Sequence, residues 1–279
     1  MMIHLIDGTY ELFRHFYGQR RFNKGKDKPF GAVVGVLNGI LAMIEKGATH
    51  LGVATDHVIE SFRNELWPGY KTGEGIDPSL LAQFHPLEEA LALMGVAVWP
   101  MVDLEADDAL ASAAHLAATD PRVQKICIWT PDKDLAQCVQ EDYIVQVDGK
   151  AEAIRDATAV IRKFGVAPPL IPDFLALVGD KADGFPGITG IGKTGAARLL
   201  NQYGPIENFP ENVLGAHRKD ALLFKRLAKL RTDEPLFKNI DELHWQGPTA
   251  AFEVFTHQIG EARLLERANV AAANLNSKD

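Results

Sequence analysis

Carboxylate side chains recur in this 279-residue sequence just where apolar runs typical of β-strands come to an end. Four of these acids are Asp7, Asp56, Asp132 and Asp134. In a parallel sheet the carboxyl ends of neighbouring strands meet at one edge, and ligands bind there. We therefore expect the four carboxylates, although they lie far apart in the sequence, to be collected at one site.

Two further motifs add acids to this set. They contribute Glu105, Asp107 and Asp108 at the predicted start of a helix, and Asp180 and Asp183 in a later loop. Glu105 and Asp108 are three residues apart and share one helix face. Taken alone, acids in a first helical turn are explained by capping and by the helix dipole. That explanation becomes weak when a separate capping or turn role must be assumed for the acid at every strand end on one edge.

Nine carboxylates at one edge would repel one another and raise their pKa values unless cations neutralised them. The set contains only oxygen ligands, with no matching His or Cys group, and such ligands favour Mg²⁺ or Mn²⁺ over Zn²⁺. Two ions about 3.5–4 Å apart would suit phosphodiester hydrolysis, by activating a water and stabilising the leaving oxygen. The sequence therefore predicts two Mg²⁺ ions, which Mn²⁺ can replace.

The elements that must position these acids follow an α/β pattern, with short apolar runs alternating with helical spacing. Strands are expected at residues 2–6, 51–55, 96–99, 125–130 and 143–147, and helices at 31–45, 80–94 and 105–118. This order predicts a mostly parallel twisted sheet flanked by helices. After about residue 168 the strand signals stop, so we expect an α/β core at 1–168 and a helical DNA-binding subdomain at 169–279.

A glycine-rich stretch at residues 187–194 fits the P-loop pattern G-x-x-x-x-G-K-[ST]. A P-loop follows a buried strand, whereas residues 170–178 have helical spacing. A helix-hairpin-helix at about 174–204 fits better, with the start of its second helix facing a phosphate. The candidate DNA contacts are Gly187, Gly190, Gly192, Lys193 and Thr194. A glycine-rich loop without a ligand remains the alternative.

Charge and composition limit the function classes. The formal net charge of −8 argues, by itself, against nucleic-acid binding. The basic residues are nevertheless concentrated at 14–28 and 193–231, either as solvated surface or as a DNA contact that includes Arg14. The sequence contains no apolar run of about 18 residues and no signal-peptide pattern. With only two cysteines, we expect a cytoplasmic protein with no membrane contact.

In this order, the motifs resemble those of the 5′-nuclease family, which includes the 5′ nuclease domain of bacterial DNA polymerase I, phage 5′ exonucleases and flap endonucleases. The resemblance spans residues 3–204. It rests on Leu5-Ile6-Asp7-Gly8, Asp56 followed by Ser61-Phe62-Arg63 and Gly69-Tyr70-Lys71, Glu105-Ala106-Asp107-Asp108, Asp132-Lys133-Asp134-Leu135, Gly179-Asp180 through Asp183, Pro186-Gly187-Ile188 and Gly190-Ile191-Gly192-Lys193-Thr194. Each motif alone is weak, but their joint order is specific.

The resemblance implies a PIN-like nuclease core with two metal sites. Asp7, Asp56, Glu105, Asp107 and Asp108 would lie on one side, with Asp132, Asp134, Asp180 and Asp183 completing the cluster. It also implies that Arg63 and Lys71 engage the scissile phosphate near the base of a helical arch at about 63–85, and that the helix-hairpin-helix turn holds K⁺. Two features depart from the family: acids at 72–77, and Gly184 where Asn is common.

We predict a structure-specific 5′ nuclease that hydrolyses DNA at 5′ flaps, junctions or 5′ ends by a two-metal-ion mechanism, in DNA replication or repair. DNA is the expected partner, and the chain is expected to be a monomer. Three alternatives are kept. A P-loop NTPase would bind ATP through Lys193, a PIN-like ribonuclease would cut RNA, and a catalytically silent junction-binding protein would hold DNA without cutting it.

Overall fold

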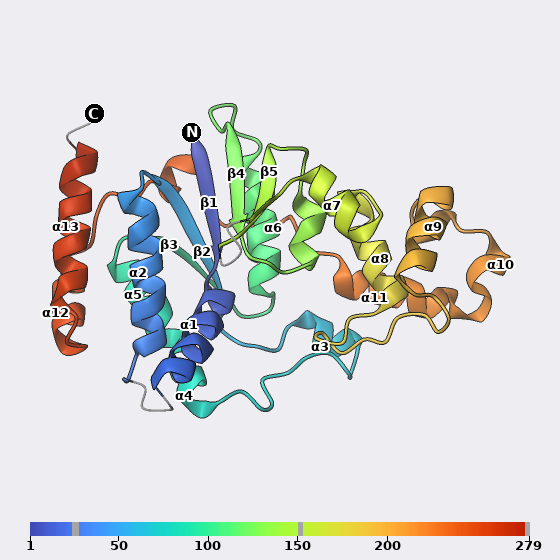
Figure 1. Ribbon diagram of the computed structural model, residues 1–279, viewed down its shortest axis with the longest axis horizontal. Coiled ribbons are helices and arrows are strands. Elements are labelled where there is room, and N and C mark those ends of the chain that lie inside the picture. Colours follow the sequence, from blue (N-terminus) through green and yellow to red (C-terminus); the bar gives the residue numbers. More distant parts are fainter. Residues whose placement is uncertain (24–27, 150–152, 277–279) are drawn as a thin grey trace.

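A twisted six-stranded sheet forms the centre of the computed structural model, which describes residues 1–23, 28–149 and 153–276 (Figure 1). The strands are β1 (Met2–Asp7), β2 (His50–Asp56), β3 (Ala97–Met101), β4 (Lys125–Trp129), β5 (Ile144–Asp148) and β6 (Ala153–Arg155). Their order is β3-β2-β1-β4-β5-β6. The first five run parallel, as predicted, and the short β6 pairs antiparallel with β5. The sequence patterns did not predict β6.

Helices cover both faces of the sheet. Helices α1 (Gly8–Asn23), α2 (Gly31–Glu45) and α5 (Phe84–Leu93) pack on one face, and α6 (Ala106–Ala117) packs on the other. Alternation along β1 explains the two layers, because successive side chains of a strand point to opposite faces. Ile3 and Leu5 are buried against α6, whereas Ile6 is buried with α2 and α5. This arrangement confirms the predicted α/β class.

The segment predicted as a helical arch is mostly irregular chain. It contains α3 (Phe62–Leu66), α4 (Pro78–Leu81) and the first two residues of α5, and residues 67–77 form turns, bends and irregular chain. Pro68 removes a backbone donor, and glycines at 69, 73 and 75 disfavour a helix. The predicted helix at 80–94 is likewise divided between α4 and α5. An arch built of long helices is thus absent from this part of the described chain.

A group of helices at one end of the molecule carries the predicted helix-hairpin-helix (Figure 1). Its members are α7 (Ala157–Phe164), α8 (Ile171–Val178), α9 (Lys193–Tyr203), α10 (Glu211–Leu214) and α11 (Arg218–Ala228). They share a core of their own, in which Phe185 stacks on Phe224 with ring centroids 5.7 Å apart. This core adjoins the sheet through the 3₁₀ helix η1 (Asp134–Cys138), which contacts α8.

The last helices return to the α/β core, so the predicted helical unit at 169–279 does not describe their packing. Helices α12 (Ala251–Gln258) and α13 (Ala262–Asn276) lie beside α2 and α5, at the opposite end from α9 (Figure 1). Trp245 is buried there, and its indole N–H donates to the Met94 carbonyl at 2.8 Å. The reason is apolar burial, since Trp245, Phe252 and Leu264 complete the α2 and α5 core.

The remaining short 3₁₀ helices are η2 (Pro168–Leu170), η3 (Ile206–Asn208), η4 (Gly215–His217) and η5 (Ile240–Leu243). Within the described ranges, every helix is too short or too polar to cross a bilayer.

Candidate metal centre

Strand ends bring the predicted acids to one edge of the sheet. Asp7 is the last residue of β1 and Asp56 the last of β2, while Asp132 and Asp134 follow β4. The close approach of these elements depends on Gly8, where an added Cβ would lie 2.7 Å from a methyl group of Val53. The edge therefore forms because the strands end together and α1 can start tightly against β2.

Five of the nine carboxylates form two groups with metal-binding geometry. Asp107, Asp132 and Asp134 have ligand oxygens within 4.8 Å of one another, and so do Asp134, Asp180 and Asp183. Asp134 belongs to both groups. Two adjacent triads that share one carboxylate offer oxygen ligands for divalent metal ions.

Asp7 and Asp56 lie at the same edge and are oriented by hydrogen bonds. The Asp7 carboxylate accepts from the Tyr10 amide at 2.8 Å and from the Thr130 hydroxyl at 3.0 Å. The Asp56 carboxylate accepts from the amide of Ala106 at 2.8 Å, where α6 begins. An acid at that position is also stabilised by the positive end of the helix dipole. Each carboxylate is thereby held in a fixed direction.

Burial and mutual repulsion raise the pKa values of several of these acids. Burial, with Asp56 and Asp132 nearby, raises the pKa of Asp7 to about 7. Burial together with Asp132 raises the pKa values of Asp107 and Asp134 well above their ordinary value. Acids in this state favour either a proton or a cation.

One buried oxygen atom of the triads suits a bound cation. Asp134 Oδ1 is buried and has no hydrogen-bond partner among the described residues. A buried carboxylate oxygen without a partner is costly, and a bound cation would satisfy it. Because the surrounding donors are all carboxylate oxygens, the residues present fit a hard divalent ion.

Two partly exposed lysines lie beside the acids. The Lys71 amine lies 2.7 Å from Glu105 Oε2 and 3.2 Å from Asp183 Oδ1, and 36% of its side chain stays exposed. Burial alone would lower the pKa of Lys71, but Glu105 and Asp183 shift it well upward. Lys133 forms an ion pair with Asp180. Lys71 is thus a charged group at the rim of the site, as a phosphate contact would require.

Arg63 is placed differently from the prediction. Its side chain is only 1% exposed, and its guanidinium donates to both oxygens of Asp108 at 2.6 and 2.8 Å. It also donates to Glu105 at 3.0 Å and to the carbonyl of Leu227 at 2.7 Å. This geometry leaves the guanidinium turned inward, so a direct contact with a phosphate does not fit the buried position.

The same network pairs Glu105 and Asp108 with basic side chains of the protein. Asp108 is fully buried and accepts from the amides of Glu105 and Arg231, at 3.0 and 2.9 Å. Burial opposes ionisation of Glu105, but Lys71 and Arg63 outweigh it, and the net pKa shift is downward. These two acids are neutralised by the chain's own cations, unlike Asp107 beside them.

The hairpin between α8 and α9 has the predicted helix-hairpin-helix form. Since a helix precedes the glycine-rich stretch, the P-loop arrangement of a strand before the loop is absent from residues 170–178. Gly187 has φ 74°, and an added Cβ would lie 2.3 Å from the Gly179 amide nitrogen, so it serves tight packing of the hairpin. Gly190 and Gly192 face open space. Lys193 and Thr194 begin α9 and are exposed.

Gly184, one of the two departures from the family pattern, has a structural reason. Its φ is 83°, and an added Cβ would lie 1.9 Å from the carbonyl oxygen of Gly69. The indole of Trp67 donates to the Gly184 carbonyl at 3.0 Å. The segment that carries Lys71 therefore packs directly on the hairpin, and a side chain at position 184 would push the two apart.

Arg14 lies on α1 and forms an ion pair with Glu11 one turn earlier. Part of the basic stretch that suggested it as a DNA contact, residues 24–27, lies outside the described residues.

Several residues that orient the acids were missed by the sequence patterns. Thr130 binds Asp7, Ser61 donates to Glu105 at 2.7 Å, and Lys133 pairs with Asp180. Thr130 and Lys133 could have been found, because both lie within or next to the motif Asp132-Lys133-Asp134. Ser61 lies in the motif Ser61-Phe62-Arg63, but its contact with Glu105 spans 44 residues and depends on the fold.

Comparison with known proteins identifies the family. A model of the 5′-3′ exonuclease N-terminal, resolvase-like domain matches residues 2–165, and a model of the 5′-3′ exonuclease C-terminal SAM fold matches residues 166–251. The chain belongs to the 5′-3′ exonuclease family.

Relatives of similar length share about a third of their residues with this 5′-3′ exonuclease family member. The 5′-3′ exonuclease of Aquifex aeolicus is 32% identical over 255 residues, which cover 88% of this chain and 87% of the relative. The 5′-3′ exonuclease of Buchnera aphidicola is 33% identical, with 82% and 81% covered. DNA polymerase I of Pseudomonas aeruginosa is 34% identical over 86% of this chain, but only 28% of the polymerase is covered.

Solved structures share the fold at lower identity. T5 5′-exonuclease with divalent metal ions (zinc) bound superimposes with a TM-score of 0.63, at 16% identity, over 94% of this chain and 99% of the other. Flap endonuclease-1 from Methanococcus jannaschii gives 0.61, at 14% identity, over 98% and 93%. The catalytic core of Rad2 in complex with DNA substrate gives 0.57, at 14% identity, over 96% and 91%.

Proposed function

We propose that this chain is a Mg²⁺-dependent, structure-specific 5′ nuclease that cuts DNA at 5′ flaps, junctions or 5′ ends. The observation that carries the proposal is the pair of acid triads that share Asp134 at the carboxyl edge of the sheet. Two relatives of this chain are named 5′-3′ exonucleases, and one solved structure of the same fold is named a flap endonuclease. Hard oxygen donors with raised pKa values suit Mg²⁺, and Mn²⁺ can replace it.

The proposed metal ligands are the five triad acids together with Asp7 and Asp56. When bound, divalent ions would supply charge neutralisation and activation of a water for phosphodiester hydrolysis. The chain's own contribution is orientation. Tyr10 and Thr130 fix Asp7, and the α6 amide of Ala106 fixes Asp56. A carboxylate held in advance needs no reorganisation when a negatively charged backbone arrives.

Lys71 is the proposed contact for the scissile phosphate. Its amine remains charged, is partly exposed, and lies between Glu105 and Asp183 at the rim of the acids. A phosphate that approached the acids would meet this amine next to the repelling carboxylates. Arg63, in contrast, is proposed as a positioning residue that holds Glu105 and Asp108 through its buried guanidinium. Glu105 would in turn orient Lys71.

The hairpin is the proposed holder of duplex DNA. The backbone at Gly190 and Gly192 is open to close approach, and the exposed start of α9 offers free amides and Lys193 to a phosphate. Such contacts position a DNA backbone without reading bases.

K⁺ bound by carbonyls of this turn, a monomeric state and a cytoplasmic location stay predictions. Light scattering checks the monomeric state, since a monomer has a mass of 30.6 kDa.

Incubation with an end-labelled 5′-flap duplex, a matched duplex and single-stranded RNA tests the proposal, with Mg²⁺, with Mn²⁺ and with a chelator. We expect metal-dependent cleavage at the flap junction or the 5′ end. Binding of the flap without cleavage would favour the silent junction-binding alternative, and cleavage of RNA alone would favour the PIN-like ribonuclease. Titration with ATP checks the remaining alternative, and we expect no binding that depends on Lys193.

A further inference from the structure

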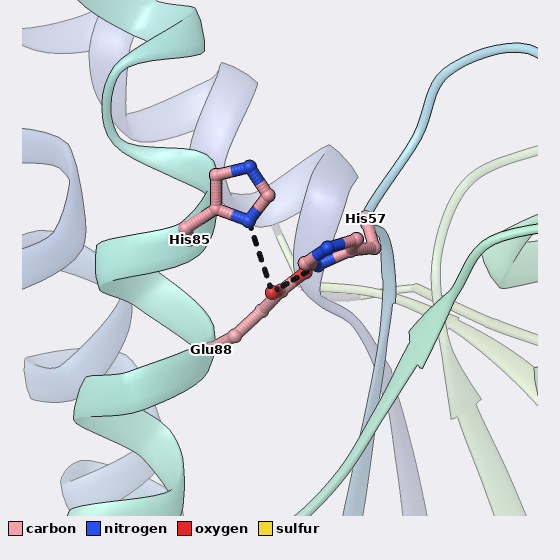
Figure 2. Close-up of side chains that lie close together, drawn as sticks. All are labelled: His57, His85 and Glu88. Carbon is pink, nitrogen blue, oxygen red and sulfur yellow. Dashed lines mark hydrogen bonds and ion pairs between the residues drawn. The ribbon is translucent and has the colours of Figure 1, made fainter.

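Two imidazoles and one carboxylate meet at a second place near the same sheet edge. His57 follows the last residue of β2, while His85 and Glu88 lie on the first turns of α5. Figure 2 shows both rings directed at one carboxylate oxygen. His57 Nδ1 lies 2.7 Å from Glu88 Oε2, and His85 Nδ1 lies 3.6 Å from the same atom. The three ligand atoms all lie within 4.8 Å of one another.

A hydrogen bond from a buried threonine orients the carboxylate of Glu88. Glu88 is only 8% exposed, and its other oxygen, Oε1, accepts from the buried hydroxyl of Thr55 at 2.8 Å. This bond turns Oε2 toward the two histidines. In protein metal sites the hydrogen-bond partners behind a ligand fix its orientation and contribute strongly to affinity. Thr55 occupies that position here.

We propose that His57, His85 and Glu88 bind one transition-metal ion of the Zn²⁺ class, with water completing the coordination. Two imidazole nitrogens and one carboxylate oxygen form a ligand set typical of zinc sites that keep an open position. With bonds of about 2.0–2.2 Å, ligand atoms around such an ion are roughly 3.3 Å apart. The His85 to Glu88 distance already suits this, and the His57 to Glu88 distance has to widen slightly.

The site differs in chemistry from the acid triads. Mg²⁺ prefers oxygen donors and dehydrates reluctantly, so it fits the carboxylates, whereas imidazole selects Zn²⁺ and its neighbours in the transition series. The competing explanation is a protonated His57 paired with Glu88. A proton between His57 and Glu88 accounts for that pair, whereas a metal ion would also use the second imidazole, which is 64% exposed and lies three residues before Glu88 on α5. Metal uptake separates the two explanations.

An ion at this place would act on the segment that carries Lys71. His57 precedes this segment and His85 follows it, so residues 58–84 run between two ligands of one ion. Most of residues 67–77 is irregular chain. A bound ion would tie the two ends of the segment together, and metal ligation of this kind stabilises the folded arrangement by mass action.

Titration with Zn²⁺ and with Co²⁺, in excess Mg²⁺ that saturates the acids, tests the proposal on the whole chain. We compare the unaltered protein with His85→Gln, and use His257→Gln as the matched control. His257 is 63% exposed and lies four residues from Glu253 on α12, so it offers a similar His and Glu pair, with no third metal ligand close by among the described residues. Because His85 is exposed, the variant should fold, and circular dichroism checks this.

The unaltered protein and His257→Gln should each bind one equivalent of Co²⁺ with visible d–d absorption, and Zn²⁺ should displace it. His85→Gln should lose at least about tenfold in affinity, since even loss of a supporting partner costs 10–100-fold. Asp132→Ala should keep this binding, which separates the site from the acid triads. The proposal is overturned if the unaltered protein takes up no Co²⁺ under these conditions, or if His85→Gln binds it equally well.

Discussion

Asp107 and Asp108 are neighbours in the sequence, but they belong to two different kinds of carboxylate site. Asp108 turns inward to the guanidinium of Arg63 and is fully buried. Asp107 turns to the edge of the sheet and meets Asp132 and Asp134. The first site is closed by a cation that the chain supplies. In the second site, Lys71 and Lys133 reach Asp183 and Asp180, but the pKa values of Asp107 and Asp134 are raised rather than lowered.

This contrast distinguishes acids that stabilise the fold from acids that are proposed to bind metal. Glu105 belongs to the first group, because Lys71 and Arg63 lower its pKa despite its burial. A buried ion pair is weak evidence for net stability, but removing one of its partners leaves an uncompensated charge. Substitutions at the inner site should therefore affect folding, and those at the edge should affect catalysis.

The largest effect is expected at the edge. Replacing Asp132 and Asp134 with Ala should lower the cleavage rate by about 10³-fold or more, since bound metal ions supply several kcal/mol of transition-state stabilisation. Binding of the flap duplex should be retained, because the proposed duplex contacts at Gly190, Gly192 and Lys193 are left unchanged. Single-turnover kinetics and a binding titration measure the two. The matched control is Asp220→Ala, an exposed acid on α11, and turnover in the double variant close to that of the control would refute the assignment.

The next effect should be a loss of stability at the inner site. Arg63→Met should lower the free energy of unfolding by about 3–5 kcal/mol, because it leaves Asp108 and Glu105 buried beside an uncharged side chain. Urea denaturation measures this. Arg122→Met is the control, since its ion pairs with Asp120 and Asp241 are exposed and should matter much less.

A double variant sharpens the same point. Arg63→Met combined with Asp108→Asn should be less destabilised than the sum of the two single variants, because residues in one ion-pair network are coupled. Strict additivity would mean that the pair contributes nothing to the fold.

A smaller effect on catalysis is expected for Lys71, which belongs to both sites. Lys71→Met should lower the cleavage rate by about 10²-fold, the usual cost of losing one charge-stabilising group. Lys71→Arg should recover part of the rate, since it keeps the positive charge. Lys46→Met, at the end of α2, serves as the control. An unchanged single-turnover rate in Lys71→Met would remove this residue from the phosphate contact.

The positions of the strand ends, and hence the edge that collects the acids, could be predicted from the sequence because apolar runs and turn residues are local signals. The α8–hairpin–α9 unit was also predictable, since helical spacing before Gly187 excluded a strand. The burial of Arg63 was not predictable. Its partner carbonyl at Leu227 lies 164 residues away and is brought near only by the packing of α11 on α8.

Two further features also depend on distant contacts. The return of α12 and α13 to the sheet core is decided by apolar contacts with α2 and α5, and amphipathic spacing does not specify a partner. The cluster at Glu88 shows the same limit. The three-residue spacing of His85 and Glu88 on one helix is visible in the sequence. The approach of His57, from the end of β2, is not.

Taken per pH unit, the smallest expected effect concerns pH, and it tests the edge without any change of sequence. Asp7 has a folded-state pKa of about 7 against an ordinary value of 3.8. Between these values the folded state holds a proton that the unfolded state has lost. The stability of the metal-free protein should therefore fall as pH rises through this window, by up to roughly 1.4 kcal/mol per pH unit for each such proton.

Saturating Mg²⁺ should flatten this dependence, because a bound cation replaces the proton as the neutralising charge. Urea denaturation at several pH values, with chelator and with Mg²⁺, measures both slopes. Asp7→Asn should reduce the slope in chelator, whereas Asp120→Asn, at an acid away from the edge whose pKa is lowered by Arg122, should not. A stability in chelator that does not fall over this pH window would mean that the edge acids are already neutralised by the chain, and the contrast between Asp107 and Asp108 would then not hold.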